Sequence, residues 1–337
     1  MTASSSNPHN PLPLEDLRPW IPSNEEYEWI RKADEKDAAF RKEMEEEGAD
    51  AVAGLFSNEE DEDDEMVTQR VQLWSSSATN PNGVGGYQTD KEQEVEEGSV
   101  RVLFVLSESW EGFGGLLWAS ARYIANVMAN DEQCRVLLEP LLKQKETTTG
   151  HPLLATSFLE LGAGAGVPSW AAMRCGARVV CTDLAKENRV RCMAESAERN
   201  WREMRSSLEE KDPILANAQR AKSCPHDWGT PVDKILKCLN ENGSEKFDVV
   251  VAADCLYMPQ CHSELLDSVK ATLSERGVAL LPFALHGNTD DASVWGIVDI
   301  AKEKGFNVET LESQQLTPSY TGMEAKQGLV HTLRLSL

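Results

Sequence analysis

Basic residues are scarce in this sequence, which contains 33 lysines and arginines against 56 aspartates and glutamates and has a net charge of −23. A protein that binds duplex nucleic acid needs a basic surface for the phosphates, so this balance argues against a nucleic-acid partner. The negative charge is uneven, because residues 1–99 carry −17 and residues 100–337 carry only −6. The acidity therefore belongs mainly to an N-terminal region.

The sequence also lacks paired cysteine motifs, long apolar runs and a basic leader. None of its eight cysteines forms a C-x-x-C pair, and several, such as Cys181, lie in apolar runs. We therefore expect reduced, mostly buried thiols and no metal site. No apolar run approaches the ~20 residues that cross a bilayer, and the first residues do not resemble a signal peptide. These absences predict a protein of the cytoplasm or nucleus with no membrane partner.

Composition divides the chain into two regions. Residues 1–97 are predicted to form an acidic, partly disordered extension with a solvated helix over residues 25–47, and residues 98–337 a folded domain. Within the extension, residues 57–65 form a block of negative charge, which repels itself and stays disordered. We interpret this block as a solubilising linker, with an interaction tail for a basic partner as the alternative.

Strand-forming and helix-forming segments alternate from residue 153 to the C-terminus, which is typical of a parallel sheet covered on both faces by helices. The last segment follows its predecessor without a clear helix, which indicates an antiparallel final strand. Residues 67–74 are rich in strand formers and could pair with residues 100–106 as a ribbon. The predicted strands are 156–161, 178–182, 221–226, 247–252, 278–285, 306–311 and 328–337, and the predicted helices are 168–175, 186–204, 231–239, 263–273 and 292–304.

The segment 158–168 organises this predicted fold. Its apolar run ends at Glu160, and three glycines, Gly162, Gly164 and Gly166, follow at alternate positions before a helical pattern begins. Such a segment predicts a buried strand and then a tight turn in which a ligand touches the main chain. The helix that follows offers unpaired N–H groups and a positive dipole end to that ligand.

Polar residues also follow three other predicted strands, and open α/β sheets bind ligands beyond the carboxyl ends of their strands. Asp183 can accept hydrogen bonds from the two hydroxyls of a ribose, or it can cap the next helix. Trp228, beside Asp227, offers an adenine ring a flat apolar face and a nearby carboxylate, with a core tryptophan as the alternative. Asp183 and Trp228 indicate a cofactor that contains adenosine, and Asp254 adds a further polar residue at a strand end.

The glycine spacing and Glu160 separate two classes of such cofactors. A dinucleotide turn follows the pattern Gly-x-Gly-x-x-Gly, but here the third glycine comes one residue earlier and Val167 takes its place. An acidic residue directly before the turn would repel a pyrophosphate and attract the ammonium and sulfonium of S-adenosylmethionine. The sequence therefore favours S-adenosylmethionine over NAD or ATP.

With these motifs, residues 98–337 resemble the class I, seven-β-strand methyltransferases that use S-adenosylmethionine. Within that superfamily they are similar to the small eukaryotic protein-lysine methyltransferases, some of which are labelled nicotinamide N-methyltransferase-like. The narrower resemblance rests on the segments 117–121, 227–229 and 254–257. It implies a monomer with a Rossmann-like, doubly wound α/β fold, whose seven-stranded, mostly parallel sheet has an antiparallel last strand.

The resemblance also implies roles for the site residues. Trp118 would lie against the cofactor, although its spacing alone also fits core packing. Asp254 would orient a neutral amine, and Tyr257 would line the channel and contact the methylated nitrogen by cation–π attraction. A helix cap and a packed aromatic are the structural alternatives for these two. The expected cofactor-binding residues are Trp118, Glu160, Gly162, Ala163, Gly164, Gly166, Asp183, Leu184, Asp227, Trp228 and Ala253.

These features predict an N-methyltransferase that acts on a lysine side chain of an intracellular protein. The acidic N-terminal region suggests a basic substrate, such as a ribosomal or translation protein. A small-molecule amine or a protein histidine is the alternative acceptor. A methyltransferase-like scaffold that binds partners without turnover is the alternative of a different class.

Overall fold

The computed structural model describes residues 66–74, 87–88, 99–107, 117–143, 150–209, 211–217, 219–240, 242–243, 245–285, 290–316 and 328–337. The predicted helix 25–47 and the acidic block 57–65 lie outside these residues. The sequence-based division at residues 97 and 98 stays a prediction.

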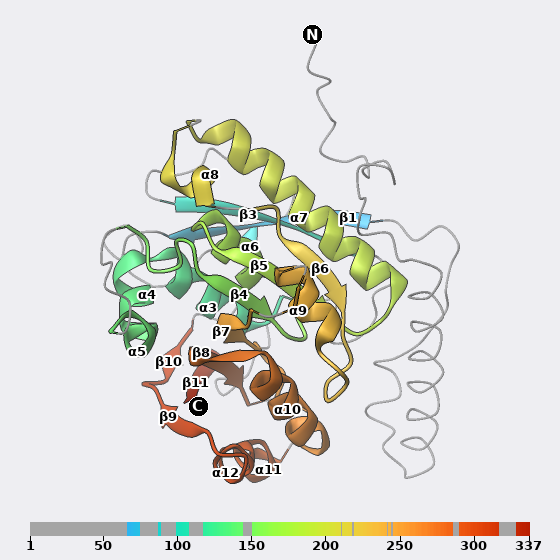
Figure 1. Cartoon of the computed structure of the whole chain (residues 1–337), viewed down its shortest axis with the longest axis vertical. Helices are drawn as coiled ribbons and strands as arrows, with labels where there is room; N and C mark the ends of the chain where they lie inside the picture. The colour runs from blue at the N-terminus through green and yellow to red at the C-terminus, as the bar shows by residue number, and fades with distance from the viewer. Residues whose placement is uncertain are drawn as a thin grey trace.

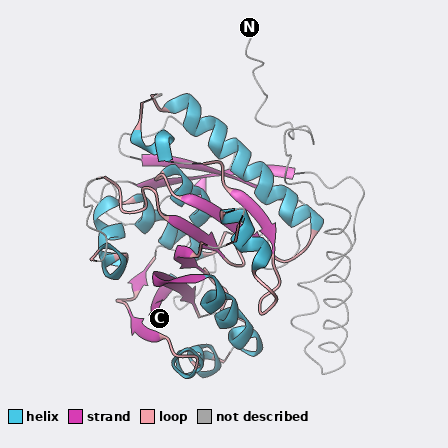
Figure 2. Ribbon diagram, in the orientation of Figure 1, coloured by secondary structure: helices cyan, strands magenta, loops and turns pink. Residues whose placement is uncertain are grey.

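One large sheet occupies the centre of the described structure (Figures 1 and 2). Its eight strands are β4 (Ser157–Glu160), β5 (Arg178–Asp183), β6 (Lys222–Pro225), β7 (Phe247–Val251), β8 (Leu273–Ala284), β9 (Asn307–Thr310), β10 (Gln314–Gln315) and β11 (Leu329–Ser336). They follow the order β10-β11-β8-β7-β4-β5-β6, and β9 also pairs with β11. Strands β4 to β8 run parallel and β11 runs antiparallel to β8, so the predicted architecture is confirmed. The two-residue β10 adds to the seven strands expected.

Helices cover both faces of this sheet (Figure 2). The helices α3 (Ala119–Ala129), α6 (Val167–Arg174) and α7 (Glu187–Ser207) lie on one face, whereas α9 (Asp233–Leu239), α10 (His262–Thr272) and α12 (Ile297–Glu303) lie on the other. The predicted helix 292–304 is divided at Gly296, a residue of low helix propensity, into α11 (Asp291–Trp295) and α12. Three short helices were not predicted: α4 (Asp131–Leu137), α5 (Glu139–Leu142) and α8 (Pro213–Asn217).

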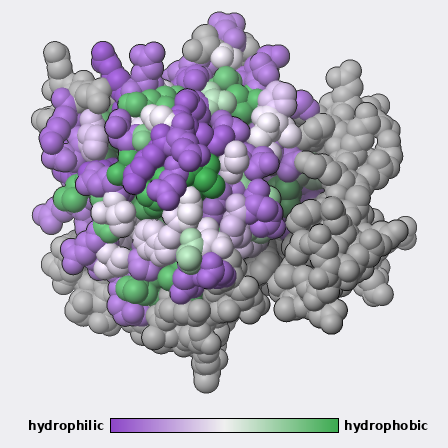
Figure 3. Space-filling model, turned by 90° about the horizontal axis from the view of Figure 1, so that it is seen from below, coloured by the Kyte–Doolittle hydropathy of each residue, from purple (hydrophilic) through white to green (hydrophobic). Residues whose placement is uncertain are grey.

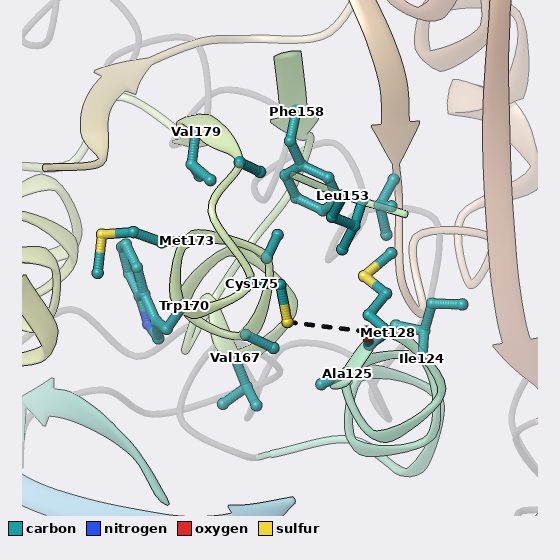
Figure 4. Close-up of a cluster of buried hydrophobic side chains, with 14 of the residues drawn as sticks. Ile124, Ala125, Met128, Leu153, Phe158, Val167, Trp170, Met173, Cys175 and Val179 are labelled. Atoms are coloured by element: carbon teal, nitrogen blue, oxygen red, sulfur yellow. Dashed lines mark hydrogen bonds between the residues drawn. The ribbon is translucent and has the colours of Figure 1, made fainter. Parts of the chain in front are cut away.

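Consecutive residues of the central strands point into two separate cores. Phe158 of β4 packs in the core of α3 and α6, while its neighbour Leu159 packs in the core of α10. Figure 4 shows the first core, in which Phe158 lies beside Leu153 and near the helix residue Met128, while Val179 of the adjacent strand lies on the other side of Phe158. Because helices bury β4 on both faces, all four of its residues are buried, and Phe158 and Leu159 are apolar up to the acidic residue that ends the strand.

A second sheet of three strands packs outside α7 (Figure 1). Strand β1 (Met66–Trp74) pairs antiparallel with β3 (Ser99–Ser107) and with β2 (Tyr87–Gln88), so the predicted pairing of residues 67–74 with 100–106 is confirmed. Side chains of α7 bond to the backbone of β3. The Asn200 amide accepts from Leu103 N–H at 3.0 Å and donates to its carbonyl at 2.6 Å, and the Ser196 hydroxyl accepts from Val105 N–H at 2.8 Å.

The surface of the described residues is mainly polar. Figure 3 shows hydrophilic side chains over much of one face, with small apolar groups between them. Among the described large apolar residues, Val136 and Leu337 are the exposed ones. Six of the eight cysteines are buried, as predicted. Within the described ranges, the helices are too short or too polar to cross a bilayer.

Candidate functional site

The strand ends that carry the predicted site residues meet at one edge of the sheet. Glu160 at the end of β4 lies opposite Cys181 of β5 and Val251 of β7 in the strand register. Backbone bonds connect the segments beyond these ends, because Ala163 N–H donates to the Thr182 carbonyl at 2.9 Å and His226 N–H to the Asp183 carbonyl at 2.8 Å. The structure thus brings the glycine turn, Asp183 and the segment after β6 together.

The glycine turn requires residues without a Cβ atom. Gly162, Gly164 and Gly166 have φ values of +63°, +50° and +67°, in the left-handed region that favours glycine. A Cβ atom at Gly162 would lie 2.8 Å from Cys255 Sγ and 2.9 Å from a ring carbon of Trp228. The turn is therefore shaped to let the Trp228 ring approach the main chain at Gly162.

Glu160 lies underneath this turn and is almost fully buried. Its Oε2 accepts hydrogen bonds from the backbone N–H and the hydroxyl of Ser169, in the first turn of α6, the former at 2.9 Å. Burial raises the pKa of Glu160 to about 8, against the lowering effect of these bonds. The sequence predicts a carboxylate here but gives no indication that Ser169 is its partner.

Asp183 is held toward the glycine turn by three hydrogen bonds. Its Oδ2 accepts from Gly164 N–H at 2.6 Å, and its Oδ1 accepts from Leu184 N–H at 2.7 Å and from the Arg189 guanidinium at 2.9 Å. Helix α7 begins after Lys186, so Asp183 does not cap it. The structure thereby removes the alternative role considered for this aspartate and leaves the ribose role as the prediction.

The segment after β6 carries the predicted adenine-side residues Asp227 and Trp228. Both are half-buried, and Trp228 packs beside the core of α10 and against Gly162. The Asp227 carbonyl accepts hydrogen bonds from the backbone N–H and the hydroxyl of Thr230, at 3.1 and 2.6 Å. Trp228 is therefore fixed at the edge of the core, with part of its ring near the turn.

Asp254 follows β7 and is nearly fully buried. Its φ of +54° is in the left-handed region, where aspartate and asparagine are the commonest residues after glycine. The Ser120 hydroxyl donates to its Oδ2 at 2.6 Å, and Ala284 N–H donates to its Oδ1 at 3.1 Å. Helix α10 begins only after Cys261, so the helix-cap alternative for Asp254 does not apply.

Tyr257 and Trp118 complete the predicted set. Tyr257 is half-buried, and burial raises the pKa of its hydroxyl, with smaller effects of opposite sign from Asp183 and Arg189. Trp118 is half-buried directly before α3, two residues from Ser120. The remaining predicted contacts, Leu184 and Ala253, are also half-buried beside Asp183 and Asp254.

Acid is expected to destabilise the segment after β6 through His226. Burial lowers the pKa of this histidine from 6.5 to about 4, and Asp227 opposes the shift only weakly. The unfolded chain therefore binds the proton more readily, and stability is lost as the pH falls from 6.5 toward 4. The loss from His226 should reach about 2 kcal/mol at pH 5 relative to pH 7.5.

Denaturant unfolding at several pH values measures this loss, with His226→Gln as the reference. Glutamine has no titrating group, so the difference in unfolding free energy between the two proteins should shrink toward pH 5. Parallel curves over this range would show that His226 does not titrate in the predicted way.

Comparison with known proteins identifies the family of this chain. Residues 100–291, more than half of the chain, match the family model described as lysine methyltransferase. The chain belongs to the lysine methyltransferase family. The chain is 31% identical over 166 residues to the protein N-terminal and lysine N-methyltransferase of Gibberella zeae. This match covers 48% of the chain and 60% of that protein.

A second curated relative, the protein N-terminal and lysine N-methyltransferase of Aspergillus fumigatus, is 29% identical to this lysine methyltransferase family member over 233 residues. The match covers 66% of the chain and 78% of that protein. The chain therefore spans about three fifths of the Gibberella relative and more of the Aspergillus one. Among solved structures, magnesium protoporphyrin IX methyltransferase from Synechocystis with bound SAM is 15% identical, with a TM-score of 0.37 over 64% of this chain and 82% of that one.

Proposed function

We propose that this chain is an S-adenosylmethionine-dependent N-methyltransferase whose main acceptor is a lysine side chain of a protein. The observation that carries the proposal is the meeting of Glu160, the glycine turn, Asp183 and Asp254 at one edge of a sheet in a chain of this family. These features follow the ends of three different strands, β4, β5 and β7, so the fold brings them together.

The residues present fit this cofactor. Gly162 has no Cβ atom, so the Trp228 ring packs directly against the main chain of the turn, and the Asp183 carboxylate faces the same turn. Asp183 would hold the ribose hydroxyls and Trp228 would cover the adenine. Glu160 would face the amino-acid end of the cofactor, whose ammonium would favour the charged carboxylate over the neutral form that burial favours in its absence. When bound, S-adenosylmethionine supplies a methyl group that its positively charged sulfur activates for transfer.

The protein's own task is to place a neutral amine and exclude water. Asp254, held by Ser120 and the Ala284 N–H, would accept a hydrogen bond from the incoming amine and aim its lone pair. Tyr257 would line the approach and attract the methylated, positively charged nitrogen to its ring. Trp118, two residues before Ser120, would close the site on the side of α3.

A protein N-terminal α-amine is the second candidate acceptor. The names of the two curated relatives describe them as methyltransferases of protein N-termini as well as of lysines. An α-amine has a pKa of about 8, against about 10.4 for lysine, so more of it is neutral at physiological pH.

We also propose that the substrate is basic, as a ribosomal or translation protein is, because residues 1–99 carry a net charge of −17. A monomer of the cytoplasm or nucleus completes the proposal.

Labelled S-adenosylmethionine and a cell lysate test this function. The chain should transfer the label to at least one protein band, and mass spectrometry should find it on a lysine or an N-terminus. Two peptides then separate the acceptors, one with a free lysine and an acetylated N-terminus, the other with a free N-terminus and acetylated lysines. Label on small molecules alone, or on histidine, would contradict the proposed acceptor. If the chain does not bind S-adenosylmethionine in calorimetry, the proposed enzyme activity is wrong.

A further inference from the structure

A buried hydrogen-bond network joins the segment 226–230 to α10. Ser268 of α10 accepts a hydrogen bond from Gly229 N–H at 2.9 Å, and its hydroxyl lies 2.9 Å from His226 Nε2. On the other side of the ring, His226 Nδ1 lies 3.4 Å from the Thr230 hydroxyl. His226 and Ser268 are both buried.

The proton positions in this network follow from its two ends. The Thr230 hydroxyl donates its single proton to the Asp227 carbonyl at 2.6 Å, so toward His226 it only accepts, and Nδ1 of the ring carries the proton. In the neutral ring Nε2 is then an acceptor, and Ser268 donates to it while accepting from Gly229. One neutral tautomer therefore satisfies every donor and acceptor of the network.

The network holds both chain neighbours of Trp228, whose ring borders the glycine turn. Trp228 lies between Asp227 and Gly229, and both of these are bonded directly by the network. His226 also donates its N–H to the Asp183 carbonyl at 2.8 Å, so the same histidine joins α10 to the strand end that carries the predicted ribose contact. Gly229 has a φ of +79°, and Glu264 of α10 lies 3.0 Å from where its Cβ would be, so the segment sits close against this helix.

We propose that His226 and Ser268 are positioning residues for the adenosine side of the site, which hold the Trp228 ring against the glycine turn from the opposite layer of the fold. This inference rests on the proposed function, because it takes the ligand at Trp228 to be the adenosine of S-adenosylmethionine. Neither residue touches the reacting atoms. Their effect is on affinity for any ligand that carries the adenosine group.

Calorimetric titration of the full chain with S-adenosylhomocysteine and with adenosine tests this proposal. Ser268→Ala removes both bonds of the serine hydroxyl at nearly constant volume, and we expect a 5- to 20-fold weaker affinity for both ligands by a common factor. Thr230→Val removes the acceptor of the Nδ1 proton and should weaken both two- to five-fold. Thr272→Val is the matched control, because Thr272 is a buried hydroxyl of α10 that bonds only to carbonyls of its own helix, at Ser268 and Val269.

The outcomes separate this proposal from the proposed function. Unchanged affinity in both Ser268→Ala and Thr230→Val, with binding by the intact chain, would overturn the positioning role and leave the function standing. An equal loss in Thr272→Val would show a general effect of α10 stability and would also overturn it. An intact chain that binds neither ligand would overturn the proposed function and, with it, this inference.

Discussion

Replacing Asp254 by asparagine is expected to lower the rate of methyl transfer about 1,000-fold and to leave the affinity for S-adenosylmethionine unchanged. The Asp254 carboxylate is buried and held by Ser120 and Ala284, so it presents an acceptor in a fixed direction. An amide in its place offers one acceptor and a donor, and it cannot orient an amine in the same way. Single-turnover transfer to a protein or peptide acceptor, alongside calorimetry with the cofactor, measures both quantities.

The backbone at position 254 decides which substitution is informative. Asparagine tolerates the left-handed φ of +54°, whereas alanine would add strain to the loss of the carboxylate. Asp254→Asn therefore isolates the chemistry, and Asp254→Ala shows how much a distorted segment adds. Ser120→Ala, which removes one of the two bonds, should reduce transfer by a smaller factor. If Asp254→Asn lost cofactor binding together with transfer, Asp254 would be a structural residue of the site.

Replacing Asp183 by asparagine is expected to affect mainly cofactor affinity and not the rate of methyl transfer. Asp183→Asn should weaken binding of S-adenosylmethionine and S-adenosylhomocysteine roughly 1,000-fold, because two charge-assisted hydrogen bonds to the ribose are lost. The transfer rate at saturating cofactor should fall much less. Calorimetry measures the affinity, and thermal unfolding shows whether the variant still folds.

Arg189→Met is the control for this variant. It removes the ion pair that Arg189 makes with Asp183 at 2.9 Å but keeps the carboxylate and its two backbone donors, Gly164 and Leu184. If Asp183 binds the ribose, Arg189→Met retains most of the affinity. If Asp183 only organises the loop, both variants weaken binding to a similar degree, and the ribose role is wrong.

The strand ends could be predicted from the sequence because burial and local chemistry coincide there. A parallel strand covered on both faces has an apolar centre, so the acidic residue that ends it, such as Glu160 or Asp183, marks its carboxyl end. Alternate glycines after Glu160 then indicate the turn. These signals are local in the sequence, and they are sufficient to locate the glycine turn, Asp183, Trp228 and Asp254.

The partners of these residues could not be predicted, because they are far away in the sequence. Ser120 meets Asp254 across 134 positions, and Ser268 meets His226 across 42. A serine on a helix gives no sign in the sequence of whether it faces water or a buried carboxylate. The pKa of Glu160 depends in the same way on burial by several elements, so the sequence showed its charge and not its environment.

The bonds between α7 and β3 also determine what the small sheet can do. Strand β3 is at the edge of its sheet, and an edge strand ordinarily offers unpaired backbone groups to any other strand. Here the Asn200 and Ser196 side chains occupy groups on Leu103 and Val105 that an added strand would need. At these two residues the edge is covered by a helix, which hinders the addition of another strand there. It also means that Leu103 and Val105 have these partners only when α7 is formed and packed against β3, so the two elements should unfold as one cooperative unit.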